Sequence, residues 1–407
     1  MVFVLGFLLF ALGIAISIAL HEFGHLLTAK AFGMKVTRYF IGFGPKIWSF
    51  RKGETEYGLK AIPAGGFCEI TGMTAMEEVD PADAPRAFYK QKTWKRVVVL
   101  SAGSITHFMV GFLVLYLSAI TLGLPNSTGS PIVQAVNDCA QSQNAKTLQY
   151  DPCAPGAPAP AKAAGVQAGD VILSVDGTAV ANYAAATKLI QDRQGPVPLV
   201  VERDGRQVSL TVDVVKQARV VDPKAKVGAD NKTQQVGVLG LSFANMIHYG
   251  PVAAVGAASG FTGQMFVSVW EGLKRFPEKV PALIKAIGGA PRDADAPVSV
   301  VGASIIGGQA AELGLWWFFL LLLANLNFFV GVFNLLPLLP LDGGHIAVNL
   351  YERARDAVRK WRGKPAGAPV DYMKLLPLTY VLVFVGGAIT LLTITADIVN
   401  PIQLSGQ

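Results

Sequence analysis

The sequence predicts a polytopic α-helical membrane protein with about four transmembrane helices, a membrane-associated β-hairpin region and one α+β domain outside the cytoplasm. Three observations predict this class. Of the 407 residues, 52% are hydrophobic and only 15% are charged. Apolar runs long enough to cross a bilayer recur along the chain. Positive charge gathers in two of the segments between these runs, and such clusters mark the cytoplasmic side.

The first apolar run predicts a transmembrane helix over residues 1–30. Met1–Leu20 carries no charged side chain, and it leads directly into His-Glu-Phe-Gly-His at positions 21–25. A secretory signal peptide is not expected, because the run lacks a basic start and is too long. Cleavage there would also remove or abut the polar cluster.

The cluster has the spacing His-Glu-x-x-His. On a helix, His21 and His25 lie one turn apart on one face, where two imidazoles can share one Zn²⁺. Glu22 can hold a water molecule on that metal. Ionisable groups inside a membrane segment are expensive and mark functional sites. The alternative is a membrane anchor followed by a chance polar cluster.

Residues 31–96 predict a cytoplasmic-side β-hairpin region followed by a loop. Glycine-rich turns separate four short β-like runs: Val36–Ile41, Pro45–Arg51, Glu56–Ile62 and Phe67–Ile70. An exposed strand edge beside a zinc helix can pair with an extended peptide. An ordinary cytosolic hairpin is the alternative.

The second span is predicted over residues 97–122. Its small residues Ala102, Gly103 and Ser104 permit close packing against another helix. A single histidine on an apolar helix usually packs or forms a hydrogen bond, so His107 is expected to do this rather than bind metal.

Residues 126–240 predict a soluble domain. A Gly-Asp turn leads into a strand near Val171, Asp176-Gly177 marks a tight turn, and a hairpin crosses Asp204-Gly205. Cys139 and Cys153 both fall in this domain. We predict a disulfide between them, because a domain outside the cytoplasm lies in an oxidising compartment; two free thiols are the alternative.

The remaining chain predicts a linker or amphipathic segment over 241–312, a third span over 313–345, a basic loop over 346–374 and a fourth span over 375–398. The third span begins with Trp316 and Trp317, as interfacial aromatics do. It then carries Asn334 and an N-x-x-P…Leu-Asp-Gly-Gly motif ending near His345. This motif predicts a helix break that lines a cavity, because freed backbone groups are costly in lipid.

Charge asymmetry orients the spans. Lysine and arginine are concentrated in 31–96 and 346–374, so both segments are expected to be cytoplasmic. Four spans then place both termini and the soluble domain on the extracytoplasmic side. The same rule brings His21, His25 and Asp342 to one depth near the cytoplasmic face.

Three protein ligands with an open fourth position define a catalytic zinc site. We expect His21, His25 and Asp342 to hold one Zn²⁺ per chain, with Glu22 as the catalytic base. Asn334 is expected to bind substrate backbone or an oxyanion. His345 is expected to support the site or the structure rather than to bind metal. The net charge of +7 does not indicate nucleic-acid binding, because the basic residues flank apolar spans.

Four features together resemble the site-2 protease family of zinc intramembrane proteases. They are the His-Glu-Phe-Gly-His motif, the Gly-Phe-Gly turn in the strand region, the segment 164–177 and the motif from Asn334 to Gly344. The soluble domain resembles a PDZ domain. The nearest form is the RseP-like bacterial subgroup in its actinobacterial form with a single PDZ domain.

The resemblance implies a multi-pass plasma-membrane metalloendopeptidase whose partners are the lipid bilayer and transmembrane protein substrates, with no nucleic acid. Members cut transmembrane segments of anti-sigma factors after a first protease has removed the outer domain. It also implies the roles given above for His21, His25, Glu22, Asp342 and Asn334. Two alternatives remain open: clearance of signal-peptide remnants, or a non-proteolytic PDZ membrane scaffold.

Overall fold

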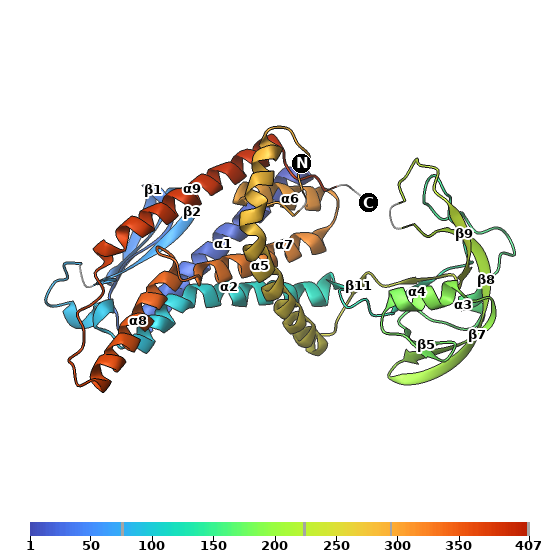
Figure 1. Cartoon of the computed structure of the whole chain (residues 1–407), viewed down its shortest axis with the longest axis horizontal. Coiled ribbons are helices and arrows are strands. Elements are labelled where there is room, and N and C mark those ends of the chain that lie inside the picture. Colours follow the sequence, from blue (N-terminus) through green and yellow to red (C-terminus); the bar gives the residue numbers. More distant parts are fainter. Residues whose placement is uncertain (75–76, 223–224, 294, 405–407) are drawn as a thin grey trace. The chain divides into compact units, whose positions relative to one another are not determined.

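The computed structural model describes residues 1–74, 77–222, 225–293 and 295–404, and it consists of two compact units. The membrane unit contains Met1–Leu122 and Tyr249–Gln407, and the domain unit contains Gly123–His248. Each unit is described by itself below (Figure 1).

The membrane unit is mainly helical. Its helices are α1 (Val2–Ala31), α2 (Thr93–Thr121), α5 (Pro251–Ile287), α6 (Val300–Glu312), α7 (Trp316–Asn334), α8 (Asp342–Trp361) and α9 (Leu376–Val399), with short 3₁₀ turns at Ala84–Arg86, Phe88–Lys90 and Tyr372–Lys374. Among the described residues, α1, α2, α5, α7 and α9 are long and apolar enough to cross a membrane. Four of them correspond to the predicted spans, and α5 falls in the predicted linker.

The part of α1 before His21 has no charged side chain, and small residues determine which side of it packs against other helices. Leu5, Leu8 and Leu12 are exposed, whereas Gly6 is buried against α6. A Cβ at Gly6 would overlap the Cβ of Ala311, so the two helices touch where glycine removes the side chain. The exposed leucines are free to face lipid.

The four predicted β-like runs are present as two long, bent strands, β1 (Val36–Lys52) and β2 (Thr55–Ile70). Residues near Tyr39 pair both with Tyr57 and with Cys68, so the two strands fold back on each other as a bent hairpin. Gly42 and Gly44 have positive φ and absorb the bend at the turn that the sequence predicts between two strands. The segment 66–70 forms one outer edge, because it pairs with β1 alone among the described strands.

Both ends of α5 are fastened to other helices of the membrane unit. At its start, the N–H of Tyr249 donates to the carbonyl of Ala119 near the end of α2. At its other end, the Nδ2 group of Asn400 donates to the carbonyls of Ala286 and Ala290. The segment 241–312, predicted as a linker or amphipathic segment, contains the 37-residue helix α5 and then α6.

The predicted break in the third span is present. Helix α7 ends at Asn334, a non-helical segment follows, and α8 begins at Asp342. The predicted basic loop over 346–374 differs from the structure, because α8 continues to Trp361. Its apolar and basic residues alternate with a helical period, which the charge count alone did not reveal.

The domain unit contains a five-stranded antiparallel sheet in the order β6-β5-β7-β8-β9. Its elements are β3 (Leu124–Pro125), β4 (Val133–Val136), α3 (Pro160–Ala163), β5 (Val171–Val175), β6 (Thr178–Ala179), α4 (Tyr183–Gln191), β7 (Gly195–Arg203), β8 (Arg206–Val220), β9 (Thr233–Val238), β10 (Leu241–Phe243) and β11 (Met246–Ile247). Strand β4 pairs with β10, and β3 pairs with β11. The unit is therefore longer at both ends than the predicted 126–240.

The predicted cysteine pair lies in this unit, where Cys139 and Cys153 form a disulfide, and Cys68 of the membrane unit is free. The turns Asp176-Gly177 and Asp204-Gly205 adopt positive φ at both residues, as the predicted tight turns require. A buried core of valine, leucine and isoleucine side chains, including Ile172, lies beneath the sheet.

A buried carboxylate joins the first part of the domain unit to its hairpin. Asp170 is 1% exposed, and Arg203 donates to both of its oxygens at 2.7 Å. The N–H of Gln167 donates to the same carboxylate at 2.9 Å. Burial raises the pKa of Asp170, but these hydrogen bonds outweigh it and hold the pKa below its usual range. Asp170 therefore stabilises the fold above its unfolded pKa of about 3.9, and the contribution is lost as pH falls through the folded pKa.

We expect Asp170→Asn to destabilise the domain unit at neutral pH, because Arg203 loses its charged partner. The expected loss is about 2 kcal/mol, or roughly 30-fold faster hydrogen exchange in strand β5 of the full-length protein. Asp204→Asn in the exposed hairpin turn is the matched control. Equal exchange rates in the two variants would contradict this account.

Candidate metal centre

Two histidines of α1 face each other across one helical turn. His21 and His25 are both buried polar side chains, each 7% exposed. Their Nε2 atoms lie 3.1 Å apart, and their ring centroids lie 4.8 Å apart. The spacing of four residues in the sequence therefore brings the two nitrogens to one point.

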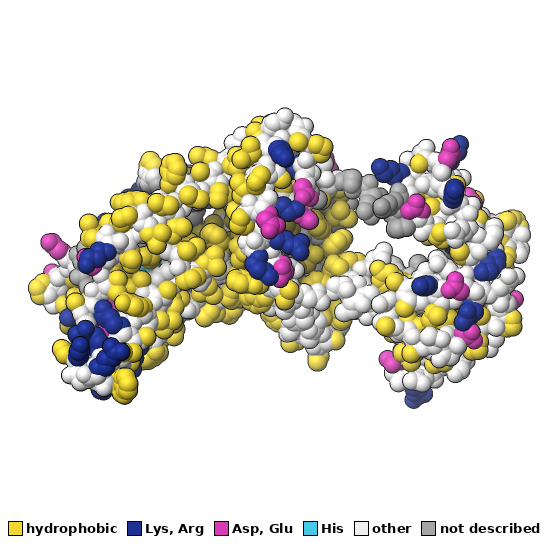
Figure 2. All heavy atoms as spheres, in the orientation of Figure 1, with side chains coloured by type: hydrophobic (Ala, Val, Ile, Leu, Met, Phe, Trp, Pro, Cys, Tyr) yellow, Lys and Arg dark blue, Asp and Glu magenta, His cyan; other side chains and the backbone are white. Residues whose placement is uncertain are grey.

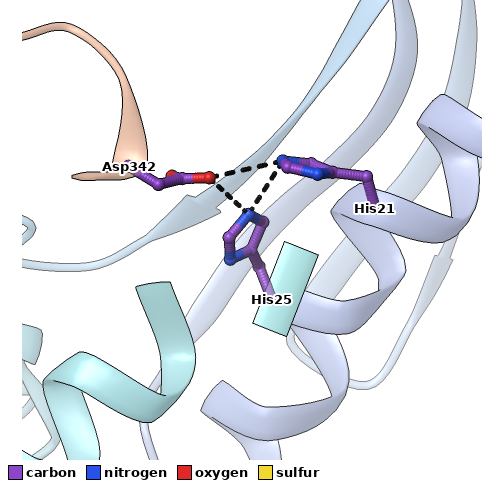
Figure 3. Close-up of side chains that lie close together, drawn as sticks. All are labelled: His21, His25 and Asp342. Atoms are coloured by element: carbon purple, nitrogen blue, oxygen red, sulfur yellow. Dashed lines mark hydrogen bonds and ion pairs between the residues drawn. The ribbon is translucent and has the colours of Figure 1, made fainter. Parts of the chain in front are cut away.

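Asp342 reaches this point from the C-terminal part of the chain. Its Oδ2 atom lies 3.4 Å from the Nε2 atoms of both His21 and His25 (Figure 3). The aspartate is the first residue of α8, so the break after α7 directs it toward α1. A Cβ at Gly343 would overlap the carbonyl oxygen of Leu335, and one at Gly344 would lie 2.6 Å from the carbonyl carbon of Leu338. The two glycines are needed because the broken segment folds directly over the start of α8.

These three side chains fit a bound cation. The Nδ1 atom of His25 lies 2.7 Å from the carbonyl oxygen of Val99, which only accepts hydrogen bonds. We therefore assign the proton of His25 to Nδ1 and a lone pair to Nε2. That lone pair faces a carboxylate oxygen and a second imidazole nitrogen. A proton on His21 Nε2 can be donated either to His25 Nε2 or to the Asp342 carboxylate, but not to both. One acceptor is then left facing another acceptor.

All three ligand atoms lie within 4.8 Å of one another. Two imidazole nitrogens and one carboxylate oxygen, with a further position open, form the donor set of a catalytic zinc site.

The close approach of α2 to the histidine pair depends on glycine. A Cβ at Gly103 would lie 2.5 Å from His21 Cε1 and 2.5 Å from His25 Nε2. A Cβ at Gly24 would lie 2.6 Å from the hydroxyl oxygen of Thr106. The sequence indicated close packing at Ala102–Ser104, but it did not indicate that the packed partner is the histidine pair.

A cavity of about 230 Å³ opens beside His21 and Asp342. Glu22 and Asn334, both predicted at the site, line it with His21 and Asp342. Gly65 and Gly66 of the β2 edge also line it. A Cβ at Gly66 would lie 3.0 Å from Glu22 Cγ, so glycine lets the strand edge pass directly beside this carboxylate.

His107 lies next to the cluster but outside it. Its Nδ1 atom lies 2.9 Å from Asn327 Oδ1, and Asn327 Nδ2 donates to the carbonyl of Leu323. His107 therefore forms a buried hydrogen bond between α2 and α7, as expected for a lone histidine. The sequence alone did not identify Asn327 as its partner, since the two residues lie far apart in the chain.

His345, one turn after Asp342, also lies outside the cluster. Its ring stacks on Tyr372, with 3.3 Å between His345 Nδ1 and the tyrosine oxygen. The contact ties the start of α8 to the segment before α9. The histidine supports the structure around Asp342, which agrees with the role expected for it.

We expect Gly103→Ala to lower metal content, because the new methyl group occupies the space of both imidazoles. The loss in zinc affinity is expected to be at least about tenfold, comparable to disrupting the support of a metal ligand. Metal content of the purified protein after dialysis against a zinc buffer measures it. Gly260→Ala in α5, where a Cβ meets open space, is the matched control. Equal zinc content in both variants would show that α2 tolerates a side chain here.

Comparison with known proteins agrees with this geometry. Residues 9–378 match the family described as Peptidase family M50. The chain is 47% identical to zinc metalloprotease Rip1 of Mycobacterium bovis (strain BCG / Pasteur 1173P2), over 99% of this chain and 100% of the relative.

It is 46% identical to zinc metalloprotease Rip1 of Mycolicibacterium smegmatis (strain ATCC 700084 / mc(2)155), over the same shares of the two chains. The Rip1 of Mycobacterium tuberculosis (strain ATCC 25618 / H37Rv) is 47% identical, again over 99% of this chain and 100% of the relative. With its apolar helices, this chain is a multi-pass zinc metalloprotease that belongs to peptidase family M50, the family of the site-2 proteases.

Proposed function

We propose that this protein cuts peptide bonds within membrane-spanning segments, with zinc held by His21, His25 and Asp342 and with Glu22 as the base. One observation carries the proposal: two imidazole nitrogens and a carboxylate oxygen from distant parts of the chain converge within 4.8 Å beside the cavity that Glu22 lines. Buried acceptors in this arrangement need a cation between them.

Zinc held at this site would supply a Lewis acid, which would acidify a water molecule and polarise the scissile carbonyl. Glu22 accepts a proton from the attacking water as the water oxygen bonds to the carbonyl carbon. The same carboxyl group then donates the proton to the leaving amine, and the C–N bond breaks. The nearby imidazoles and Asp342 hold the metal and leave Glu22 free for proton transfer.

Asn334 and the β2 edge are proposed to hold the substrate. The Asn334 side chain lines the same cavity and can donate to a substrate carbonyl or to a developing oxyanion. Gly65 and Gly66 bring the start of the outer β2 segment to this cavity. An unwound substrate segment can pair with a strand edge through its backbone, which fits the extended geometry that peptide hydrolysis requires.

We infer four membrane spans, formed by α1, α2, α7 and α9, with α5 lying along the extracytoplasmic side. The hydrogen bonds at Ala119 and Asn400 tie the two ends of α5 to the C-terminal ends of α2 and α9. In the charge-based topology these two ends face the same side of the membrane. Lys274, Arg275 and Lys279 of α5 then suit a position at the headgroups.

The domain unit is proposed to be a PDZ-like domain that limits access to the site. The strand at Val171–Val175 and the hairpin across Asp204-Gly205, on which the predicted resemblance to a PDZ domain rests, support this proposal. In this proposal the substrates are transmembrane anti-sigma factors that a first protease has trimmed, and the domain excludes substrates that still carry a bulky outer part. Clearance of signal-peptide remnants is the alternative, and recruitment by the domain is the alternative to exclusion.

We expect Glu22→Gln to retain zinc and lose cleavage, because the amide cannot accept the proton of water. The rate of cutting a model transmembrane substrate should fall by about 10²–10⁴-fold, the usual contribution of a general base. His21→Ala and Asp342→Ala should instead lose zinc as well as activity. Retained turnover in Glu22→Gln at full zinc content would refute the mechanism.

Removal of the domain unit tests the exclusion model. Leu122 and Tyr249 flank the unit, and the bond between Tyr249 N–H and the Ala119 carbonyl holds the flanks together. A short glycine-serine linker can therefore replace residues 123–248. We expect the shortened protein to cut full-length substrate, while the intact protein cuts only the trimmed form. Loss of activity on trimmed substrate by a zinc-loaded deletion variant would favour activation by the domain instead.

A further inference from the structure

Helix α8 has one side held by protein and one side that is bare. On the held side, Asn349 is buried and donates to the carbonyl of His345. Glu352 forms an ion pair with Arg96 of α2 at 3.6 Å, and both side chains are at most 16% exposed. This side anchors α8 to α2 at the end of the bundle that carries Asp342.

The bare side is apolar. Leu350, Val358 and Trp361 are 51%, 48% and 85% exposed. With the exposed Ala354 between them, they are spaced by four, four and three residues, so they lie on one side of the helix. Tyr351, 60% exposed, lies next to this row. An apolar row of this length on an exposed helix indicates an interacting surface.

Basic side chains accompany the apolar row. Arg353 and Lys360 lie two turns apart along one flank, and Arg362 and Lys364 follow the last turn. These four have no ion pair with a carboxylate in the part of the chain that the structure describes. In contrast, Arg355 pairs with Asp356. Figure 2 shows the basic cluster at the C-terminal end of α8, beside exposed apolar side chains.

We propose that α8 lies in the cytoplasmic membrane interface and binds anionic phospholipid, and that this contact holds Asp342 beside the histidine pair. The bare apolar row enters the boundary between headgroups and acyl chains, and the four unpaired cations bind headgroup phosphates. Both ends of α8 connect to helices that are long and apolar enough to span the membrane, α7 and α9. The helix is therefore kept next to the bilayer, which makes lipid the occupant of this surface.

The link to the site follows from where the helix begins. Asp342 is the first residue of α8, and Gly343 and Gly344 pack tightly beneath the preceding segment. A rotation or tilt of α8 moves the Asp342 carboxylate away from His21 and His25, because no flexible linker separates Asp342 from the rest of the helix. Headgroup contacts that hold the helix thus also hold the carboxylate. This second step rests on the zinc site proposed above.

Depth-dependent quenching tests the lipid contact. The full-length protein with Cys68→Ala and Val358→Cys, labelled with a bimane, is placed in nanodiscs whose lipids carry brominated acyl chains. We expect quenching in discs containing phosphatidylglycerol, and an at least about fivefold smaller quenched fraction in pure phosphatidylcholine discs. Equal quenching in both discs, or none in either, would overturn the proposal.

A charge variant provides the matched comparison. Replacing Arg353, Lys360, Arg362 and Lys364 with Gln should reduce quenching in phosphatidylglycerol discs to the level seen in phosphatidylcholine. The same number of substitutions at positions of the domain unit, Lys188, Arg206, Lys226 and Lys232, should leave quenching unchanged. Equal loss in both variants would mean that total charge, rather than α8, attracts the lipid.

Zinc release tests the link to Asp342. We expect the half-life for transfer of zinc to a chromogenic chelator to be at least about fivefold longer in phosphatidylglycerol discs than in phosphatidylcholine discs. The α8 charge variant should remove this difference. Equal half-lives together with lipid-dependent quenching would refute the link. A protein that never binds zinc would instead contradict the proposed site, while quenching would still report on α8.

Discussion

The Asp342 carboxylate lies 3.4 Å from two imidazole nitrogens that also face each other. Such groups cannot be left exposed to an apolar medium, because unpaired polar atoms are costly there. The membrane unit encloses them with α1, α2 and the start of α8. Gly24, Gly103 and Gly343 make this enclosure possible, since each lacks the side chain that would push the helices apart.

The opposite end of the membrane unit is joined by a second buried polar group. Arg292 pairs with Asp397 near the end of α9, and the two side chains are 3% and 1% exposed. Asp397 also accepts the N–H of Ser299, just before α6. Removing one partner of a buried ion pair costs more free energy than the intact pair contributes to stability, because the other charge is left buried and unpaired. The Arg292–Asp397 pair therefore specifies which helix ends meet. It therefore fixes α6, against which α1 packs, and so supports the helix that carries the histidines.

The domain unit depends on none of these contacts. It has its own buried core, its own disulfide and the Asp170–Arg203 pair. The chain leaves the membrane unit at Leu122 and returns at Tyr249, where a backbone hydrogen bond to Ala119 closes the gap. The candidate metal centre and the domain unit thus belong to parts of the protein that fold around separate cores.

Local patterns in the sequence were sufficient for the elements and for the identity of the candidate site. Residues four apart on a helix must share a face, so the pairing of His21 with His25 follows from their spacing alone. Long apolar runs predicted α1, α2 and α9 with ends close to the observed ones, whereas the third span was predicted to continue to 345 and α7 ends at Asn334. The two glycines and prolines around Asp342 predicted the break that directs this residue to the site.

Only the tertiary structure decided which residues meet across the chain. Nothing local in the sequence pairs Gly103 with the histidines, Asn327 with His107, or Gly66 with Glu22, because these contacts depend on how closely two backbones approach. The helical nature of α8 and the length of α5 were also missed. In both segments charged and apolar residues are mixed, and which side of the helix is covered depends on the neighbours that pack against it.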